Sequence, residues 1–488
     1  MNVKMIGRFL SQIIAIEAFF MLPALGISFF SGETSATLGF VYTIAICVVL
    51  AGTMYLICRK AGRLFAAREG FVCVSFSWVM LSLLGALPFV ISGAIPRYID
   101  AVFEIVSGFS TTGASVISDV EALPKGILYW RSFSHWLGGM GVLVFLLAIV
   151  PGGERDTGFT MHLLRAESPG PDVGKLVPKM KNTAMILYII YVALTVLNFI
   201  FLLFGNMPVL DALCIAFGTA GTGGFGIYND SFGSCSPYVL WVTTVFMFLF
   251  GINFSCYYLL LQRQIKAVAK DEELRLYIGI SVATALLIAV NIFSRANALY
   301  DTAGEALTHA AFQVSSVMTT TGFSSVDYDL WPSFSKGILL MLMLIGACAG
   351  STGGGFKVAR LMLIFKSLRR NIRQVLNPKK VQIVRNNGSA VSETVLANTN
   401  AYLAAYVIII VVSYLVISLD GNSIGTNLSA VLACFNNIGP GFEAVGPMCN
   451  YAHFSDLSKI MLSLDMLAGR LEIFPILILL SRGTWKRR

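Results

Sequence analysis

The segment Ser110-Thr111-Thr112-Gly113-Ala114-Ser115 is polar and glycine-centred, and it lies between two long apolar runs. Three related segments follow at rather even intervals, namely 221–226 (GTGGFG), 319–324 (TTTGFS) and 438–442 (IGPGF). Polar, glycine-rich backbone at membrane depth is tolerated only where it lines a watery cavity or is buried in protein. Four such segments around one axis would direct backbone carbonyls at a dehydrated cation. The repeat therefore indicates a chain that conducts an ion.

The composition is that of a membrane protein. The chain has 488 residues, of which 56% are hydrophobic and 12% charged, whereas a soluble domain typically has about 25% charged residues. Several stretches are free of charge and as long as the roughly 20 residues that a membrane-spanning helix needs, including 71–95, 183–210, 276–294 and 337–356. We therefore predict an all-α polytopic membrane protein, with the apolar run 9–30 retained as its first helix rather than removed as a signal peptide.

The formal net charge of +9 is distributed by topology and is not a nucleic-acid signal. Lysine and arginine gather at the N-terminus and in five further places, namely 59–68, 155–181, 263–275, 357–385 and 482–488. The connections between these clusters are poor in basic residues, so the positive-inside rule predicts that both termini are cytoplasmic. The basic segment 366–385 has three interpretations, namely contact with anionic membrane lipid, docking of a cytosolic subunit, or topology charge alone.

The chain divides into two leading helices and four similar units. The leading helices, about 3–30 and 36–58, occupy 1–66 and have no pore loop between them. Each unit is predicted to contain an outer helix, a short half-buried helix, a glycine segment and an inner helix. The units are 67–180 with a cytoplasmic loop, 181–272, 273–393 with an intramembrane loop and a basic cytoplasmic segment, and 394–488. The predicted architecture is four such units around one pore.

The short helices share a register with their glycines. Asp100 and Asp211 each stand thirteen residues before the glycine of their segment, and His309 does the same in the third unit. In the fourth unit, whose glycine is Gly441, the corresponding residue is Leu428, and the polar start is lost. We predict that Asp100 and Asp211 cap the N-termini of their helices and place a negative charge at the positive end of the helix dipole.

These segments, taken with three other runs, resemble a known family. The runs are RSFSHWLGGMG at 131–141, GACAGSTGGGFKVAR at 346–360 and AGRLE at 468–472. The chain resembles the membrane subunit of Trk/Ktr/HKT-type potassium uptake systems, and most closely the bacterial Trk subunit, over essentially its whole length. The resemblance implies K⁺ as the transported ion, no organic cofactor, and a place in the bacterial cytoplasmic (inner) membrane. It also implies a homodimer with one pore per protomer and a cytosolic ring of nucleotide-binding (RCK-type) regulatory subunits.

The resemblance places a potassium filter on three residues of each segment. These are Thr111, Thr112 and Gly113; Thr222, Gly223 and Gly224; Thr320, Thr321 and Gly322; and Gly439, Pro440 and Gly441. In the family, serine in place of the first glycine commonly goes with sodium selectivity, so the resemblance implies potassium here, where Gly113, Gly224, Gly322 and Gly441 are all glycine. Glycine can adopt the conformations that point consecutive carbonyls inward. Pro440 fixes φ and has no N–H, so the filter departs from four-fold symmetry, and the strictness of its selectivity is left open.

The run Gly350-Ser351-Thr352-Gly353-Gly354-Gly355 interrupts the predicted inner helix of the third unit. Glycine costs about 1 kcal/mol relative to alanine inside a helix, so three in succession should unwind it. The run is not a phosphate-binding loop, because it lacks the G-K-[ST] ending. The resemblance implies an intramembrane loop beneath the filter that blocks ions until it moves, with Lys357 just below it. The alternative is close helix packing by small residues.

Arg470 lies in the last long apolar stretch, where an ionisable residue costs roughly 3 kcal/mol on insertion scales and normally has a role. The resemblance places Arg470 beneath the filter, where its guanidinium would hinder cations and restrain the loop. The alternative is a structural ion pair with Asp465 or Glu472.

Two other functions are considered. The first is a secondary transporter that couples the same pathway to protons or sodium, as in a symporter. The second is an enzyme, which the sequence disfavours because it has only four histidines and neither an HExxH nor a GxSxG motif.

Overall fold

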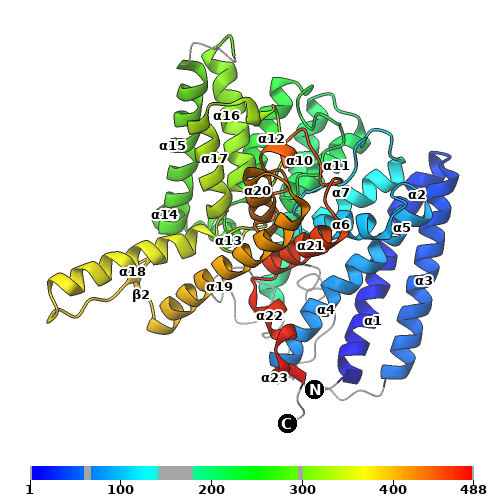
Figure 1. Cartoon of the computed structure of the whole chain (residues 1–488), viewed down its shortest axis with the longest axis horizontal. Coiled ribbons are helices and arrows are strands. Elements are labelled where there is room, and N and C mark those ends of the chain that lie inside the picture. Colours follow the sequence, from blue (N-terminus) through cyan, green and yellow to red (C-terminus); the bar gives the residue numbers. More distant parts are fainter. Residues whose placement is uncertain (1–2, 60–66, 140, 142–179, 295–299, 486–488) are drawn as a thin grey trace.

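The protein is built almost wholly of helices (Figure 1), as a computed structural model shows for residues 3–59, 67–139, 141, 180–294 and 300–485. Most of the cytoplasmic loop predicted within 67–180 lies outside these residues, at 142–179. Strands in the described ranges are limited to β1 (Arg385–Asn386) and β2 (Ser389–Ala390), which pair antiparallel. The turn between them is Asn387-Gly388, both at positive φ, a common hairpin turn.

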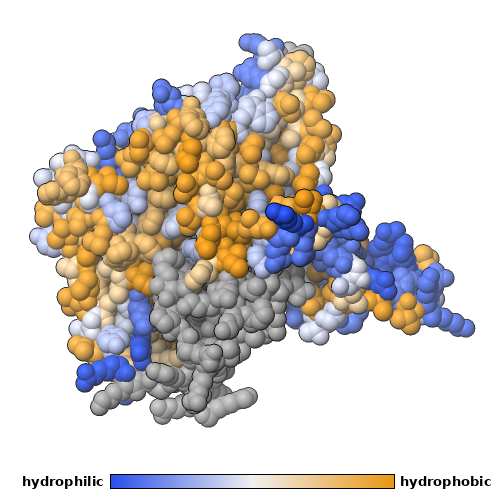
Figure 2. Space-filling model, turned by 180° about the vertical axis from the view of Figure 1, so that it is seen from behind, coloured by the Kyte–Doolittle hydropathy of each residue, from blue (hydrophilic) through white to orange (hydrophobic). Residues whose placement is uncertain are grey.

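Six helical segments of the described chain are long and apolar enough to cross a membrane. They are α1–α2 (Val3–Phe20, Leu22–Phe30), α3 (Thr34–Cys58), α4–α5 (Ala67–Gly85, Leu87–Ile91), α10 (Met180–Phe204), α15 (Glu272–Ser294) and α19 (Glu393–Ile417). Apolar residues gather over much of the face seen in Figure 2. Exposed apolar side chains of α10, α15 and α19 include Ile189, Val290 and Ile408, each more than 60% exposed. Such a surface is stable only against lipid or protein. The predicted all-α polytopic membrane fold is confirmed.

Four short helices each precede one glycine segment. They are α6 (Tyr98–Phe109), α11 (Val209–Gly221), α16 (Ala303–Met318) and α20 (Ile424–Phe435). The inner helices that follow them are α7 (Lys125–Gly139), α12 with α13 (Pro237–Phe250, Phe254–Leu261), α17 with α18 (Ser333–Ile345, Val358–Leu376) and α21 with α22 (Asp456–Arg470, Phe474–Leu480). The remaining elements are α14 (Ile265–Lys270), α23 (Arg482–Trp485) and the 3₁₀ turns η1 (Tyr328–Leu330), η2 (Ser418–Asp420) and η3 (Glu443–Val445).

The predicted N-caps at Asp100 and Asp211 are wrong. The residues at the cap positions of α6 and α11 are Arg97 and Pro208. Both aspartates lie one turn later, as the third residue of the helix, so the negative charge near the helix start is kept although the capping bond is absent. Asp211 instead accepts a hydrogen bond from the Tyr228 hydroxyl at 2.9 Å.

The helix α18 and the β1–β2 hairpin form an arm that projects away from the rest of the chain (Figure 1). Apolar side chains repeat along α18 at helical spacing and are exposed, namely Phe365, Leu368, Ile372 and Val375. Basic residues lie between them, so the arm has an uncovered apolar stripe beside a positive face.

Candidate functional site

The four short helices lead into the same backbone geometry. After each helix, one residue has a left-handed φ, and a glycine with a left-handed φ follows two positions later. The pairs are Thr111 (58°) and Gly113 (82°), Thr222 (53°) and Gly224 (81°), Thr320 (58°) and Gly322 (86°), and Asn437 (56°) and Gly439 (95°). The residue between each pair donates its N–H to a helix carbonyl at 2.8 Å, namely that of Ser107, Gly218, Ser316 or Ala433. The repeat seen in the sequence is thus a repeat of conformation.

This geometry corrects the register of the fourth segment. We expected Gly441 as the fourth equivalent glycine, but the position belongs to Gly439. Gly441 lies two residues further on, where its N–H donates to the Val445 carbonyl at 2.7 Å. In the corrected register the polar start of the short helix is kept, because Thr426 stands thirteen residues before Gly439. Asn437 replaces threonine at the left-handed position, which asparagine tolerates well.

The four glycines Gly113, Gly224, Gly322 and Gly439, called the ring glycines below, form a closed ring. A Cβ atom added to any of them would come within 3.0 Å of a backbone carbonyl of the next segment. These carbonyls belong, in order, to Gly223, Thr321, Ile438 and Thr112. Each is the residue before the next ring glycine, so the first segment touches the second and the fourth touches the first. Backbone meets backbone at every junction, and with a left-handed φ only glycine fits.

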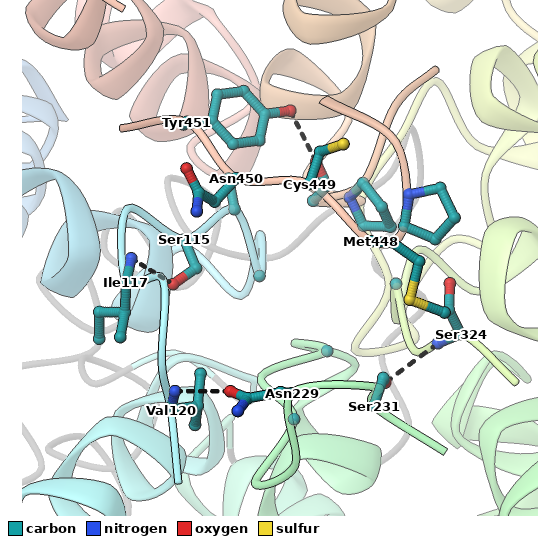
Figure 3. A pocket seen from close by; sticks show the side chains of 18 of the residues that line it. Ser115, Ile117, Val120, Asn229, Ser231, Ser324, Met448, Cys449, Asn450 and Tyr451 are labelled. Carbon is teal, nitrogen blue, oxygen red and sulfur yellow. Dashed lines mark hydrogen bonds between the residues drawn. The ribbon is translucent and has the colours of Figure 1, made fainter. Parts of the chain in front are cut away.

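A polar cavity of about 130 Å³ opens on one side of the ring (Figure 3). All four ring glycines line it, together with the segments that follow them. Neighbouring segments are joined around it, because Asn229 Oδ1 accepts from Val120 N at 2.8 Å and Ser231 Oγ accepts from Ser324 N at 3.2 Å. The cavity therefore leads to the carbonyls of the ring.

A buried ion pair holds the wall between the first two segments. Arg131 Nε and Glu104 Oε1 are 2.6 Å apart, and neither side chain is more than 3% exposed. Glu104 also accepts from Val116 N at 2.9 Å, and Arg131 donates to the Gly226 carbonyl at 2.8 Å and lies over the Phe225 ring at 3.6 Å. These extra partners offset the cost of burying two charges. The pair connects α6, α7 and both segments beyond the glycines.

His135 supports the same two segments from behind. Its Nδ1 lies 2.8 Å from the Gly108 carbonyl, and its Nε2 accepts from Phe225 N at 3.2 Å, so the proton of the neutral ring is on Nδ1. In the sequence, the run 131–141 is only a family motif, and neither His135 nor Arg131 has a predicted role. The available signal was the presence of two ionisable side chains in a helix that packs on a glycine segment.

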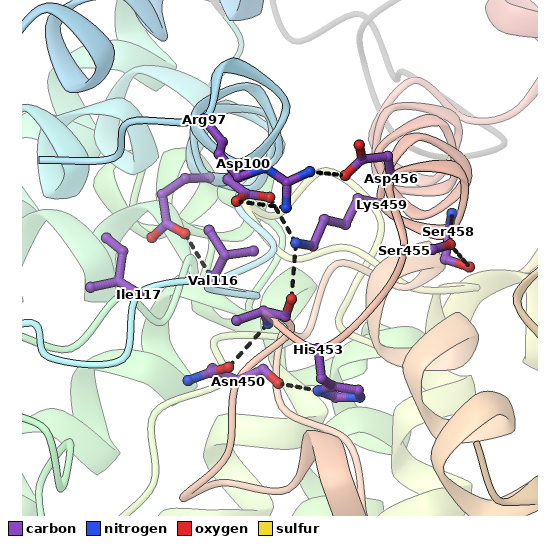
Figure 4. Close-up of polar contacts among 12 residues, drawn as sticks. Arg97, Asp100, Val116, Ile117, Asn450, His453, Ser455, Asp456, Ser458 and Lys459 are labelled. Carbon is purple, nitrogen blue, oxygen red and sulfur yellow. Dashed lines mark hydrogen bonds and ion pairs between the residues drawn. The ribbon is translucent and has the colours of Figure 1, made fainter. Parts of the chain in front are cut away.

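Ionic contacts join the fourth unit to the first (Figure 4). Lys459 of α21 is 1% exposed, and its Nζ donates to Asp100 Oδ1 at 2.7 Å and to the Ala452 carbonyl at 3.0 Å. Beside it, Arg97 pairs with Asp456 at 2.6 Å. The start of α6 is thereby attached to the start of α21 and to the segment before it.

The inner helices are interrupted in more units than we predicted. The expected break in the third unit extends from 346 to 357, between α17 and α18. Shorter breaks separate α12 from α13, which are bent by 89°, and α21 from α22. In the last of these, Glu472 and Ile473 both have a positive φ. A broken inner helix is therefore a repeated feature, and the third unit has the longest break in the described chain.

The 346–357 loop packs against the glycine segments of the third and fourth units. Gly354 N donates to Thr320 Oγ1 at 2.6 Å. A Cβ atom on Gly353 would lie within 3.0 Å of the Thr319 carbonyl, and one on Gly354 within 3.0 Å of the Asn436 carbonyl. The glycines thus permit direct contact between the loop and residues that precede the ring glycines.

The loop is also bonded to the bend of the second unit. Cys348 N donates to the Gly251 carbonyl at 3.1 Å, and Phe254 N donates to the Gly350 carbonyl at 3.0 Å. Movement of the loop would therefore have to break contacts with the α12–α13 bend.

Arg470 joins the loop to the first unit. Its guanidinium donates to the Thr352 carbonyl at 2.7 Å and to the carbonyls of Gly138 and Gly139 at 2.6 and 2.5 Å. Of the two acidic partners proposed for it, Glu472 pairs with Arg360, and Asp465 accepts from Ser413 Oγ at 2.7 Å. Lys357 Nζ donates to a loop carbonyl, that of Gly353. Two cationic side chains thus hold the loop by its backbone.

Glu273 accepts hydrogen bonds from residues on both sides of the glycine run. It lies in the first turn of α15 and is 9% exposed. Its Oε1 accepts from Ala349 N at 2.6 Å and from Ala359 N at 3.2 Å. This contact could not be predicted, because Glu273 is one of several charged residues at the start of an apolar run.

The ring is suited to neutral, oxygen-based coordination. No group of three or more histidine, cysteine, aspartate or glutamate residues in the described chain is placed to hold a metal ion. The oxygens near the ring are peptide carbonyls and threonine hydroxyls, which suit a monovalent cation that must be released again.

In the outer loops, the hydrogen bond from Asn229 lowers the pKa of Asp119, and the hydrogen bonds from Ser423 and Thr426 lower the pKa of Glu443.

Comparison with known proteins agrees with this arrangement. Residues 37–484 match the family described as "TrkH: Cation transport protein". The chain is similar to the Trk system potassium uptake protein TrkH of Salmonella typhimurium, at 36% identity over 436 residues and 88% of each chain. It is also similar to TrkG of Escherichia coli, at 31% identity over 99% of each chain. The crystal structure of the potassium transporter TrkH from Vibrio parahaemolyticus superposes with a TM-score of 0.88, 31% identity and full coverage of both chains. This chain is a multi-pass membrane protein that belongs to the TrkH family of cation transport proteins.

Proposed function

We propose that this chain is the potassium-conducting membrane subunit of a Trk-type uptake system. The observation that carries the proposal is the closed ring of four glycines at the base of a polar cavity. Its relatives are named as potassium uptake proteins. In this proposal the two helices of 1–66 flank four pore units, 67–180, 181–272, 273–393 and 394–488, and the chain is a transporter rather than an enzyme.

The filter consists of the three residues that end in each ring glycine. They are Thr111, Thr112 and Gly113; Thr222, Gly223 and Gly224; Thr320, Thr321 and Gly322; and Asn437, Ile438 and Gly439. Pro440 follows the ring and restricts the backbone of the fourth segment, and Gly441 lies beyond it. Carbonyls from four segments replace the hydration shell of the ion.

The gate is the loop Gly350-Ser351-Thr352-Gly353-Gly354-Gly355. It packs against residues that precede two ring glycines, and Lys357 and Arg470 hold its carbonyls. A positive charge at this point raises the energy of a passing cation. Opening requires the loop to leave these contacts, which a cytosolic partner would drive by favouring the open state.

The proposed partner surface is the exposed side of the α18 arm. The arm of α18 carries the exposed apolar stripe of Phe365, Leu368, Ile372 and Val375 beside basic residues. The partners proposed for this surface are a second copy of the chain and a nucleotide-binding RCK-type regulatory ring, with anionic membrane lipid around it. The basic clusters favour cytoplasmic termini by the positive-inside rule, and the membrane we propose is the bacterial inner membrane. No nucleic acid is involved.

The test is cation flux through the purified full-length chain in liposomes. Potassium, rubidium, sodium and lithium are compared, each with and without a gradient of protons or sodium. Passive flux that favours potassium supports the proposal. The broken inner helices also occur in secondary transporters, so uptake that requires the second gradient would instead support a symporter. Absence of potassium flux from folded protein would refute both.

A further inference from the structure

One carbonyl of the ring has a hydrogen-bond partner that the other three lack. The Tyr451 hydroxyl donates to the Gly439 carbonyl at 2.7 Å. Within the described residues, the carbonyls of Gly113, Gly224 and Gly322 accept no hydrogen bond. The asymmetry also affects the backbone, because the φ of Gly439 is 95° and those of the other ring glycines are 81–86°.

Tyr451 is held firmly enough to impose this contact. It is 2% exposed, its ring packs against Phe103 and Phe454 with centroids 5.6 and 5.8 Å apart, and its N–H donates to the Ser115 carbonyl at 2.8 Å. The next carbonyl along the chain, that of Ala452, accepts from Lys459 (Figure 4). The hydroxyl therefore cannot leave Gly439 without disturbing a packed wall.

The hydroxyl proton is directed at Gly439. A carbonyl oxygen has no proton and can only accept, so the Tyr451 hydroxyl is the donor of the 2.7 Å bond to Gly439. The bond lies at the wall of the cavity above the ring (Figure 3).

We propose that Tyr451 is a specificity-determining residue, because its hydroxyl competes with the permeating cation for the Gly439 carbonyl. The inference rests on the filter function proposed above. The ring then presents three uncommitted carbonyls and one that is already engaged. Discrimination between potassium and sodium depends on the number and field strength of coordinating carbonyls. Potassium is the larger ion and is coordinated by more oxygens. The hydrogen bond to the Gly439 carbonyl therefore weakens potassium binding more than sodium binding.

The substitution Tyr451→Phe removes the hydroxyl and keeps the ring. The matched control is Tyr328→Phe, since the buried Tyr328 hydroxyl donates to the carbonyl of Gly441, outside the ring, at 2.9 Å. Full-length wild-type and variant chains in liposomes are compared by their potassium-to-sodium permeability ratio. We expect Tyr451→Phe to raise the ratio about fivefold, the factor that corresponds to one hydrogen bond of about 1 kcal/mol. We expect Tyr328→Phe to leave the ratio unchanged.

An unchanged or lowered ratio in Tyr451→Phe refutes the inference, and so does an equal increase in both variants. If Tyr451→Phe does not fold, 3-fluorotyrosine at position 451 provides the test, because its more acidic hydroxyl donates more strongly. A lower ratio then supports the inference, and an unchanged ratio refutes it. The wild-type chain separates this inference from the proposed filter function. If wild type passes potassium and the Tyr451 variants leave the permeability ratio unchanged, only this inference is refuted. Failure of the wild type to pass potassium refutes the filter itself.

Discussion

Replacing Arg470 by alanine is expected to raise cation flux in the absence of any cytosolic partner. Arg470 donates one hydrogen bond to the loop, to the Thr352 carbonyl, and two to the end of α7, at Gly138 and Gly139. A hydrogen bond from a charged donor contributes about 1.5–3 kcal/mol. Losing the bond to the loop lowers the free energy of loop opening by that amount and shifts the equilibrium towards the open state by roughly 10- to 150-fold.

The assay is rubidium flux through the full-length chain in liposomes, normalised to correctly assembled protein, with the melting temperature measured in parallel. Arg470→Lys is the matched control, because lysine keeps the charge but lacks the planar fork that bridges several carbonyls. We expect its flux to lie between those of wild type and Arg470→Ala. Equal flux from wild type and Arg470→Ala, combined with a lowered melting temperature, would refute restraint of the loop and assign Arg470 a structural role.

Four further outcomes are expected. Gly113→Ser should lower the potassium-to-sodium permeability ratio more than it lowers expression, because its Cβ meets the Gly223 carbonyl; an unchanged ratio in well-expressed protein would remove Gly113 from the filter. Deleting 351–355 should raise partner-independent flux, and equal or lower flux from a folded deletion would make the run a packing element. Glu273→Gln weakens the two charge-assisted hydrogen bonds from Ala349 N and Ala359 N by about 1 kcal/mol each. Rubidium flux in liposomes should therefore rise at least several-fold, and an unchanged flux would contradict a role of Glu273 in holding the 346–357 loop. Since hydrogen bonding lowers the pKa of Asp119 below its ordinary 3.8, its contribution to outer-loop stability should be complete above about pH 4 and lost as pH falls below that value. Protection of the Asp119 loop from protease, measured against pH, reports this loss of stability. A loss of protection already at pH 5 would contradict the prediction.

The sequence predicted the fold class and the break in the inner helix of the third unit, because both depend on local composition. Apolar runs of spanning length require helices in a membrane, and three glycines in succession unwind a helix wherever they lie. The same reasoning identified the ring glycines of the first three segments, in each of which a threonine stands two residues before the ring glycine. It failed in the fourth, where Gly439 and Gly441 both qualify by type. The deciding signal was Asn437, since asparagine is the residue other than glycine that most readily takes the left-handed conformation.

The contacts that hold the site could not be predicted, because they join residues far apart in the chain. Glu104 and Arg131 meet across two helices, and Glu273 reaches two amides in another element. The predicted cap at Asp100 was wrong by one turn, and its carboxylate instead accepts from Lys459, more than 350 positions away in sequence. Residue type revealed that these side chains needed partners, but only the folded chain identifies them.

The closed ring has a further consequence, because its four walls are unlike and lie on one polypeptide. In a tetramer of identical subunits, a single mutation enters the pore four times, so any gain at one wall is accompanied by the same change at the other three. Here the Glu104–Arg131 pair is found in the first wall, the 346–357 loop in the third and the Tyr451 hydroxyl in the fourth. Natural selection can therefore alter one wall while the others keep the ion pathway intact. With four unlike segments on one polypeptide, the ion pair, the loop and the Tyr451 hydroxyl can change separately.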